Sequence, residues 1–246
     1  MSKIPIVFCG SGPVAAQSLE LLLDNFEIIA VVTKPRPLHH RGDFPVIELS
    51  KQYNLPVYTV SNKDELSNLI KTRPFITELA ILIDFGIIVT RDVIDYFPKG
   101  IINSHFSLLP EWRGADPITF SILSGQTKTG VSLMLIDEGM DTGDIISVGE
   151  QELDGTETGK TLTNKLVHLS DALLKNNVPS YLAGKTKGID QSKLADLIEG
   201  HPNKPTYSKK LTKSDGILDF SKPADVLERE VRAFIEWPKS KTTLAD

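Results

Sequence analysis

Residues 4–33, IPIVFCGSGPVAAQSLELLLDNFEIIAVVT, determine the fold class that we expect for this chain. An apolar, strand-like run at 4–9 passes through a glycine-rich turn into an amphipathic stretch at 13–23. A second strand-like run follows at 27–32. A strand, a helix and a second strand in this order form the repeating unit of a parallel sheet with right-handed crossovers.

The same alternation continues as far as His105. Helical patterns at 46–53 and 62–71 alternate with strand-like runs at 55–60, 79–83 and 100–105, and a short helix begins near Thr90. Ser61 and Asp64 give the capping-box signal for the helix at 62–71. We therefore predict an α/β fold with a doubly wound, mostly parallel sheet.

The second half of the chain follows another pattern. Asp116 and Pro117 are typical of a helix start, and Gly125 of its end. Strand-like runs at 130–136 and 145–152 flank a loop at 137–144, which predicts an antiparallel addition to the sheet.

Two helices and an irregular stretch are expected after this addition. A long helical pattern covers 158–182, and a polar, irregular connection covers 184–206. The last helix is expected to be capped by Ser221 and to reach about Phe234.

Length and composition indicate an ordinary globular protein. The chain has 246 residues, of which 40% are hydrophobic and 24% charged, and its net charge of -5 provides no overall attraction to nucleic acid. No apolar run approaches the roughly 20 residues that a membrane-spanning helix needs, so we expect no membrane association. The start resembles no signal peptide and the single cysteine, Cys9, has no disulfide partner, so we expect a cytoplasmic protein.

The glycine-rich turn at 10–15 matches the G-x-G-x-x-A pattern of dinucleotide-binding proteins. The second strand, however, ends in Thr33 and Lys34, with no acidic residue to hold a ribose hydroxyl. We interpret the motif as a tight turn in which glycine supplies the backbone freedom, with dinucleotide binding as the alternative.

The most informative stretch is NSHFSLLP at 103–110, where a strand runs into a loop that ends in proline. Residues two apart on a strand share a face, so Asn103 and His105 project together while Ile102, Ser104 and Phe106 face the other way. An amide and an imidazole in one place can donate hydrogen bonds to a carbonyl oxygen that becomes negative in a transition state. The alternative is a structural histidine with satisfied hydrogen bonds at a strand end.

The loop at 137–144 carries four carboxylates in eight residues. Their spacing does not match an EF-hand, and we expect no metal site. One of these carboxylates could orient the imidazole of His105, although spacing alone does not identify which one. Serine-elbow, phosphate-loop, C-x-x-C and H-E-x-x-H motifs are absent from the sequence.

Several of these stretches together resemble the 10-formyltetrahydrofolate-dependent formyltransferases, and within them the methionyl-tRNA formyltransferases. The stretches are VFCG at 7–10, TKP at 33–35, NSH at 103–105, SLLP at 107–110, EWRGADPI at 111–118, GMDTGDI at 139–145, TYSKKL at 206–211 and RAFIEWP at 232–238. The resemblance therefore covers nearly the whole chain. It implies a Rossmann-like catalytic domain at 1–185, followed at 186–246 by a linker and helical extension that leads toward a C-terminal domain absent from this chain.

The resemblance also assigns roles to individual residues. It implies that the catalytic residues are Asn103, His105 and Asp141. It places the folate along the residues Phe85, Gly86, Ile87, Ile88, Ser107, Leu108, Leu109, Pro110, Asp137 and Gly139, and the tRNA at Arg41. It further implies 10-formyltetrahydrofolate as the formyl donor, with no metal, and methionyl initiator tRNA as the acceptor of a monomeric enzyme.

Two departures from the family pattern concern the donor and the acceptor. Phe106 stands where the family usually carries a smaller residue, which predicts a reshaped folate site. The basic loop around Arg41 is shorter than in the tRNA enzymes. An amino-sugar nucleotide is therefore an alternative acceptor, because sugar formyltransferases are similar around the same three catalytic positions.

Overall fold

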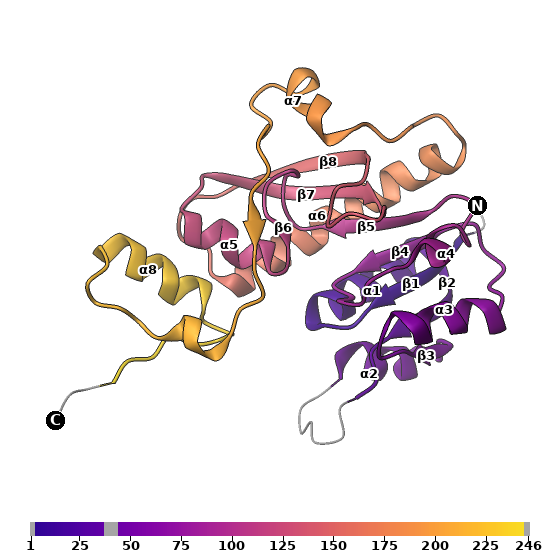
Figure 1. Cartoon of the computed structure of the whole chain (residues 1–246), viewed down its shortest axis with the longest axis horizontal. Helices are drawn as coiled ribbons and strands as arrows, with labels where there is room; N and C mark the ends of the chain where they lie inside the picture. Colours follow the sequence, from indigo (N-terminus) through magenta and orange to yellow (C-terminus); the bar gives the residue numbers. More distant parts are fainter. Residues whose placement is uncertain (1–2, 37–43, 244–246) are drawn as a thin grey trace.

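The computed structural model describes residues 3–36 and 44–243, which form a seven-stranded sheet covered by helices on both faces (Figure 1). The strand order is β3-β2-β1-β4-β5-β7-β8. The first five strands of this order run parallel, and β7 and β8 are antiparallel additions. The strands are β1 (Ile4–Gly10), β2 (Phe26–Thr33), β3 (Val57–Thr59), β4 (Ala80–Ile83), β5 (Ile101–His105), β7 (Lys128–Leu135) and β8 (Ile145–Glu152). The predicted fold class is confirmed.

Alternate residues of the strands pack into two separate cores. Ile6 and Phe8 of β1 join one core, whereas Val7 and Cys9 join the other. The first core is covered by α1 (Pro13–Asn25), α2 (Pro45–Gln52), α5 (Pro117–Ser124) and α6 (Gly159–Leu182), and the second by α3 (Lys63–Thr72) and α4 (Arg91–Ile94). Such burial on both faces explains why these strands are almost continuously apolar. No helix within the described ranges has the length and apolarity to cross a membrane.

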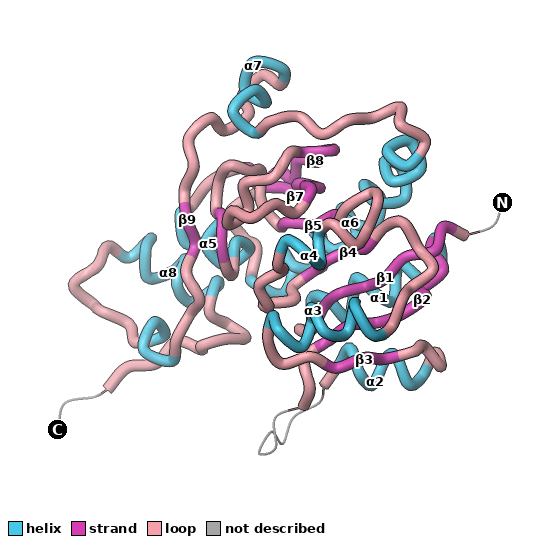
Figure 2. Tube along the Cα trace, turned by 45° about the vertical axis from the view of Figure 1, so that its right-hand side comes forward, coloured by secondary structure: helices cyan, strands magenta, loops and turns pink. Residues whose placement is uncertain are grey.

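The segment after residue 183 is more ordered than expected. It forms a 3₁₀ turn at Gln191–Lys193, α7 (Leu194–Leu197), a second 3₁₀ turn at Lys213–Gly216, and α8 (Ala224–Ala233), which packs against α5. Its strand β9 (Tyr207–Ser208) pairs in parallel with β6 (Arg113–Gly114), and Figure 2 shows the two lying side by side. The expectation of an irregular connection at 184–206 was therefore wrong in part. Strands of two residues and single helical turns are too short to produce a detectable hydrophobic period.

The capping prediction for α3 was wrong by one residue. The cap is Asn62, whose side-chain oxygen accepts hydrogen bonds from the backbone N–H groups of Asp64 and Glu65 at 3.0 Å. The carboxylate of Glu65 in turn accepts a hydrogen bond from the backbone N–H of Ser61. Asparagine caps as well as serine does, so the two adjacent candidates could not be separated by propensity.

The predicted starts of two other helices also need correction. Helix α8 begins after Pro223, while Ser221 lies in a turn closed by Asp219, because the residue before a proline is disfavoured in a helix. Asp116 does precede α5, but its carboxylate accepts a hydrogen bond from the backbone N–H of Leu211 and does not cap the helix.

Strand β5 places its side chains as the alternation predicts. Ile102 and Phe106 lie in the core beneath α6, and the buried hydroxyl of Ser104 forms a 2.7 Å hydrogen bond with that of Ser170 on α6. Asn103 and His105 lie on the opposite face of the strand. The bulk of Phe106 therefore packs into the core on the face away from these two residues.

The pair of buried hydroxyls that links β5 to α6 gives a stability prediction. Ser104→Ala leaves the Ser170 hydroxyl buried without its partner, which should lower the free energy of unfolding by about 1–3 kcal/mol. The double variant Ser104→Ala with Ser170→Ala should cost about 1 kcal/mol less than the sum of the two single variants, because it leaves no unpaired hydroxyl. Urea unfolding monitored by circular dichroism measures both quantities.

Ser124→Ala, on the exposed end of α5, is the control, and we expect it to stay within about 0.5 kcal/mol of the wild type. Additive effects of the two buried substitutions would contradict the assigned role of this hydroxyl pair.

Candidate active site

The candidate site begins at the carboxyl end of β5, beside the ends of β1 and β4. Asn103 pairs in register with Leu82 of β4, and His105 is the last residue of β5. Both side chains are buried, with 7% and 6% of their surface exposed. Ligands of open α/β sheets bind at this edge, where neighbouring strands connect to opposite sides.

The imidazole of His105 lies between two groups from later segments of the chain. Its Nε2 lies 2.9 Å from the backbone carbonyl oxygen of Trp112, and its Nδ1 lies 3.9 Å from Oδ2 of Asp141. A carbonyl oxygen can only accept, so Nε2 must carry a proton and donate it. Nδ1 is consequently the ring nitrogen that faces the carboxylate.

Asp141 is fixed by the same segment that contacts the imidazole. The backbone N–H of Gly114 donates a 2.7 Å hydrogen bond to Oδ2 of Asp141. Trp112 and Gly114 thus bond, through their backbones, to the two side chains that sequence reasoning brought together. The sequence carries no signal for this role, because backbone groups are the same for every residue type.

The amide of Asn103 makes no hydrogen bond to any other described residue, although the side chain is buried. The amide atoms are not fully enclosed, so solvent or a ligand at the end of β5 can reach them.

The segment 107–110 is buried, and most of its backbone polar groups are already paired. The Ser132 hydroxyl accepts from the backbone N–H of Leu109 at 3.0 Å and donates to the carbonyl of Ser107 at 2.7 Å. The carbonyl of Leu109 lies 2.7 Å from Nε2 of His201. This segment can therefore shape a ligand site by its packing but has few hydrogen-bonding groups left to offer.

Two other loops, at 84–90 and 137–144, carry exposed apolar side chains. Ile88 is 74% exposed and Met140 is 60% exposed, whereas Phe85 is fully buried beneath its loop. Ile87 of the first loop and Ile136, directly before the second loop, pack against the same core.

The acidic loop is held by its own side chains. The carboxylate of Asp137 accepts hydrogen bonds from the backbone N–H of Gly139 and from the Thr142 hydroxyl. A Cβ atom at Gly139 would lie 1.9 Å from the Thr142 hydroxyl oxygen, so this position requires glycine. Across residues 3–36 and 44–243, no three His, Cys, Asp or Glu side chains are grouped so that they could hold a metal ion.

Residues 3–178 match the family described as formyl transferase. The chain belongs to this family. Relatives named methionyl-tRNA formyltransferase come from Myxococcus xanthus, 35% identical over 252 residues, and Francisella tularensis subsp. mediasiatica, 34% identical over 257 residues. These alignments cover 99% and 100% of this chain and 77% of each relative.

Solved structures of other formyltransferases share the fold of this formyltransferase. An N-formyltransferase from Helicobacter canadensis, in complex with folinic acid and dTDP-3-aminofucose, gives a TM-score of 0.70 at 20% identity and covers 99% of this chain and 84% of that one. A 4-N formyltransferase from Francisella tularensis gives a TM-score of 0.72 at 17% identity, with 97% and 92% covered.

Asp84 is a charged residue of the formyltransferase site region that sequence reasoning missed. It follows β4 directly, and its Oδ2 would lie 1.9 Å from a Cβ atom at Gly12. The pKa of Asp84 is raised to about 6, chiefly by desolvation of its carboxyl and also by the charge of Asp116, while Lys34 opposes the shift. A carboxylate directly after an all-apolar strand was the signal that could have identified it.

The position of Asp84 also bears on the alternative of dinucleotide binding. Its carboxylate lies over the glycine-rich turn at the N-terminus of α1, where a pyrophosphate would bind in a dinucleotide-binding protein. Two negative groups in this place would repel each other. The turn is a tight connection, but the expectation that glycine supplies backbone freedom there was wrong: Gly12 has an ordinary φ of −93°, and it is needed because a Cβ atom would meet Asp84.

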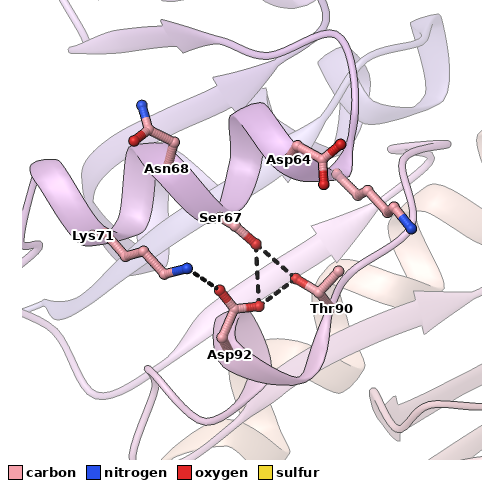
Figure 3. A pocket seen from close by; sticks show the side chains of 7 residues that line it. Asp64, Ser67, Asn68, Lys71, Thr90 and Asp92 are labelled. Carbon is pink, nitrogen blue, oxygen red and sulfur yellow. Dashed lines mark hydrogen bonds and ion pairs between the residues drawn. The ribbon is translucent and has the colours of Figure 1, made fainter.

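Two hollows in the formyltransferase lie away from the predicted catalytic residues. One, of about 550 Å³, lies between α3 and α4, where Lys71, Asp92, Ser67 and Thr90 bond to one another (Figure 3). The other, of about 390 Å³, lies between α5 and α8. Neither is lined by Asn103, His105 or Asp141. Arg41, the predicted tRNA contact, lies outside the described residues.

The raised pKa of Asp84 predicts a pH-dependent stability difference. In the unfolded chain an aspartate ionises near pH 4, whereas Asp84 in the fold ionises near pH 6. Ionised Asp84 therefore lowers the free energy of unfolding. This loss is absent below pH 4, grows between pH 4 and 6, and is complete above pH 6. Asp84→Asn should therefore be more stable than the wild type at pH 7.5. We expect a difference of about 1 kcal/mol, below the full linkage value, because neighbouring groups desolvate the carboxyl while much of the surface of the residue stays exposed and solvent screens the charge.

Urea unfolding at pH 4, 5, 6 and 7.5 measures this difference, which should shrink as the pH falls from 6 to 4. Asp196→Asn, at an exposed position of α7, is the control. A stability difference for Asp84→Asn that is constant from pH 4 to 7.5 would contradict the prediction.

Proposed function

We propose that this formyltransferase transfers the formyl group of 10-formyltetrahydrofolate to the α-amine of methionine on initiator methionyl-tRNA. The observation that carries the proposal is the convergence of an amide, an imidazole and a carboxylate, from Asn103, His105 and Asp141, at the end of β5. These three groups supply what acyl transfer to an amine needs: donors for the oxyanion and a route for the proton.

The proposed reaction forms one carbon–nitrogen bond and breaks another. The neutral amine attacks the formyl carbon, and the carbonyl oxygen becomes negative in the tetrahedral intermediate. When the intermediate collapses, the bond from the formyl carbon to N10 of the folate breaks, and N10 takes up a proton as the amine loses one. No covalent bond to the protein and no metal ion is required.

The free N–H groups of Asn103 are the proposed donors to the oxyanion. The imidazole of His105 contributes through Nδ1, because its Nε2 is engaged by the carbonyl of Trp112. With Nδ1 protonated, the ring can donate to the oxyanion and balance the charge of Asp141. With Nδ1 deprotonated, it can accept the proton of the attacking amine, while the carbonyl of Trp112 holds the ring through Nε2.

The residues of the two exposed loops fit the formyl donor. Ile88 and Met140 present apolar surface to solvent on two loops whose neighbouring residues, Ile87 and Ile136, pack against the same core, and the flat pteridine ring would require such apolar surface. Phe85, Gly86 and Ile87 complete the first loop, and Asp137 and Gly139 belong to the second. The buried segment 107–110 would pack beneath the bound donor and shape its site.

Methionyl-tRNA is the acceptor that sequence similarity favours. The relatives named methionyl-tRNA formyltransferase are 34–35% identical over almost the whole chain. Two of the solved structures, the N-formyltransferase in complex with dTDP-3-aminofucose and a sugar 3N-formyl transferase, are 20% and 22% identical, although they cover 99% and 98% of this chain. That extensive coverage makes an amino-sugar nucleotide the second candidate.

The acceptor can be identified by supplying 10-formyltetrahydrofolate with one amine at a time. We expect formylation of methionyl initiator tRNA, measured by acid-precipitable radiolabel from the formyl donor, and no product from dTDP-amino sugars, measured by mass spectrometry. The His105→Ala protein serves as the inactive control. Formylation of the sugar nucleotide alone would overturn the proposed acceptor and leave formyl transfer intact.

Removing the Asn103 amide tests the proposed oxyanion donor. Asn103→Ala should lower kcat by about 10²- to 10³-fold, because one donor to the developing negative charge is lost. Asn68→Ala, at the α3 hollow, removes an amide far from β5 and should leave kcat unchanged. An Asn103→Ala protein with wild-type kcat would contradict the assigned role, provided that its circular dichroism spectrum matches the wild type.

A further inference from the structure

Gln191 lies in the segment after residue 185 and contacts the loop that carries Asp141. Its side chain is buried, with 4% of its surface exposed, and it belongs to the 3₁₀ turn at Gln191–Lys193. Its Nε2 donates hydrogen bonds to the carbonyl oxygens of Asp141 at 2.9 Å and Gly143 at 3.0 Å. Its Oε1 accepts a hydrogen bond from Nη2 of Arg113 at 2.7 Å.

These three hydrogen bonds reach both segments that contact the imidazole of His105. Arg113 stands between Trp112, whose carbonyl accepts from His105, and Gly114, whose N–H donates to Asp141. Gln191 therefore holds Asp141 through its backbone, while Gly114 holds it through its carboxylate.

The backbone of Asp141 needs such support. Its φ angle is +53°, in the left-handed region, which costs free energy for a residue other than glycine and persists only when surrounding contacts enforce it. At Gly143 a Cβ atom would lie 1.7 Å from the carbonyl oxygen of Leu135, so the loop is pressed against β7. The two donated hydrogen bonds of Gln191 act on the carbonyls of Asp141 and Gly143 themselves.

The turn that carries Gln191 is itself anchored on the sheet. Ile189 forms two backbone hydrogen bonds with Ile145, at the start of β8, of 2.8 and 2.9 Å. Leu194 packs into a small core with Leu109, Met134 and Ile145. Gln191 is thus presented to the loop by a fixed support, which a positioning residue requires.

We propose that Gln191 is a positioning residue for formyl transfer, which sets the place of the Asp141 carboxylate beside Nδ1 of His105. The inference rests on the proposed role of Asp141 in the reaction. It makes the segment after residue 185 a working part of the site, although the family match ends at residue 178.

Two substitutions separate the contacts of Gln191. Gln191→Met has a similar size and loses all three hydrogen bonds. Gln191→Glu keeps an acceptor for Arg113 but cannot donate to the carbonyls of Asp141 and Gly143. Gln151→Met is the matched control, because it removes a 2.8 Å amide-to-carbonyl hydrogen bond at an exposed position of β8.

We expect both Gln191 variants to lower kcat by about 10- to 100-fold, because displacing a catalytic group slows the reaction by about this factor. KM for the formyl donor should stay within about twofold of the wild type. Backbone amides at 137–144 should exchange hydrogen about tenfold faster in both variants. Gln151→Met should change neither quantity. Thermal unfolding shows that each variant is folded at the assay temperature, and Gln191→Glu remains as the test if Gln191→Met does not fold.

Wild-type kcat in Gln191→Glu would overturn the proposal, as would a rise in KM at unchanged kcat. The kinetics use whichever amine the wild type formylates, and hydrogen exchange needs no acceptor. If the proposed acceptor is wrong, the wild-type protein will not formylate methionyl-tRNA. If the proposal about Gln191 is wrong, the variants will keep the wild-type kcat and the wild-type rate of amide hydrogen exchange.

Discussion

The backbone of residues 112–114 is the constraint on which the arrangement of the site depends. The carbonyl of Trp112 accepts from one nitrogen of His105, and two residues later the N–H of Gly114 donates to the carboxylate of Asp141. One short segment, which starts in a turn with Trp112 in the left-handed region, thus contacts both an imidazole on β5 and a carboxylate on a loop. The Trp112 carbonyl accepts only from a protonated nitrogen, so Nε2 carries a proton and points toward it. Nδ1 is left facing the carboxylate.

This segment is held in turn by residues far away in the sequence. The backbone N–H of Trp112 donates to the Thr206 hydroxyl at 2.9 Å, and β6 pairs with β9 at Tyr207–Ser208. Carbonyls of Trp112 and Arg113 also accept from the Ser208 hydroxyl. A pair of two-residue strands provides little stability alone, but it here connects the site to the part of the chain that leads to α8.

The sequence predicted the parts of the fold that repeat over many residues. Strands buried on both faces and amphipathic helices have clear periods, so the parallel sheet, its antiparallel addition and the shared face of Asn103 and His105 could all be predicted. The choice between Ser61 and Asn62 as a cap could not, because both residues cap helices well. The β6 and β9 pairing and the contacts of Gln191 depend on residues 48 to 95 positions apart, which no local pattern encodes.

The site combines a rigid element with a supported loop for a physical reason. A strand holds Asn103 and His105 at fixed spacing, because residues two apart on a strand share one face. The carboxylate that faces Nδ1 comes from a loop, where the backbone of Asp141 is left-handed. Such a conformation is stable only when hydrogen bonds surround it, and here they come from Gly114 on one side and Gln191 on the other. The chain after residue 185 therefore supports, through Gln191, the backbone of the loop that we propose to act at the sheet edge.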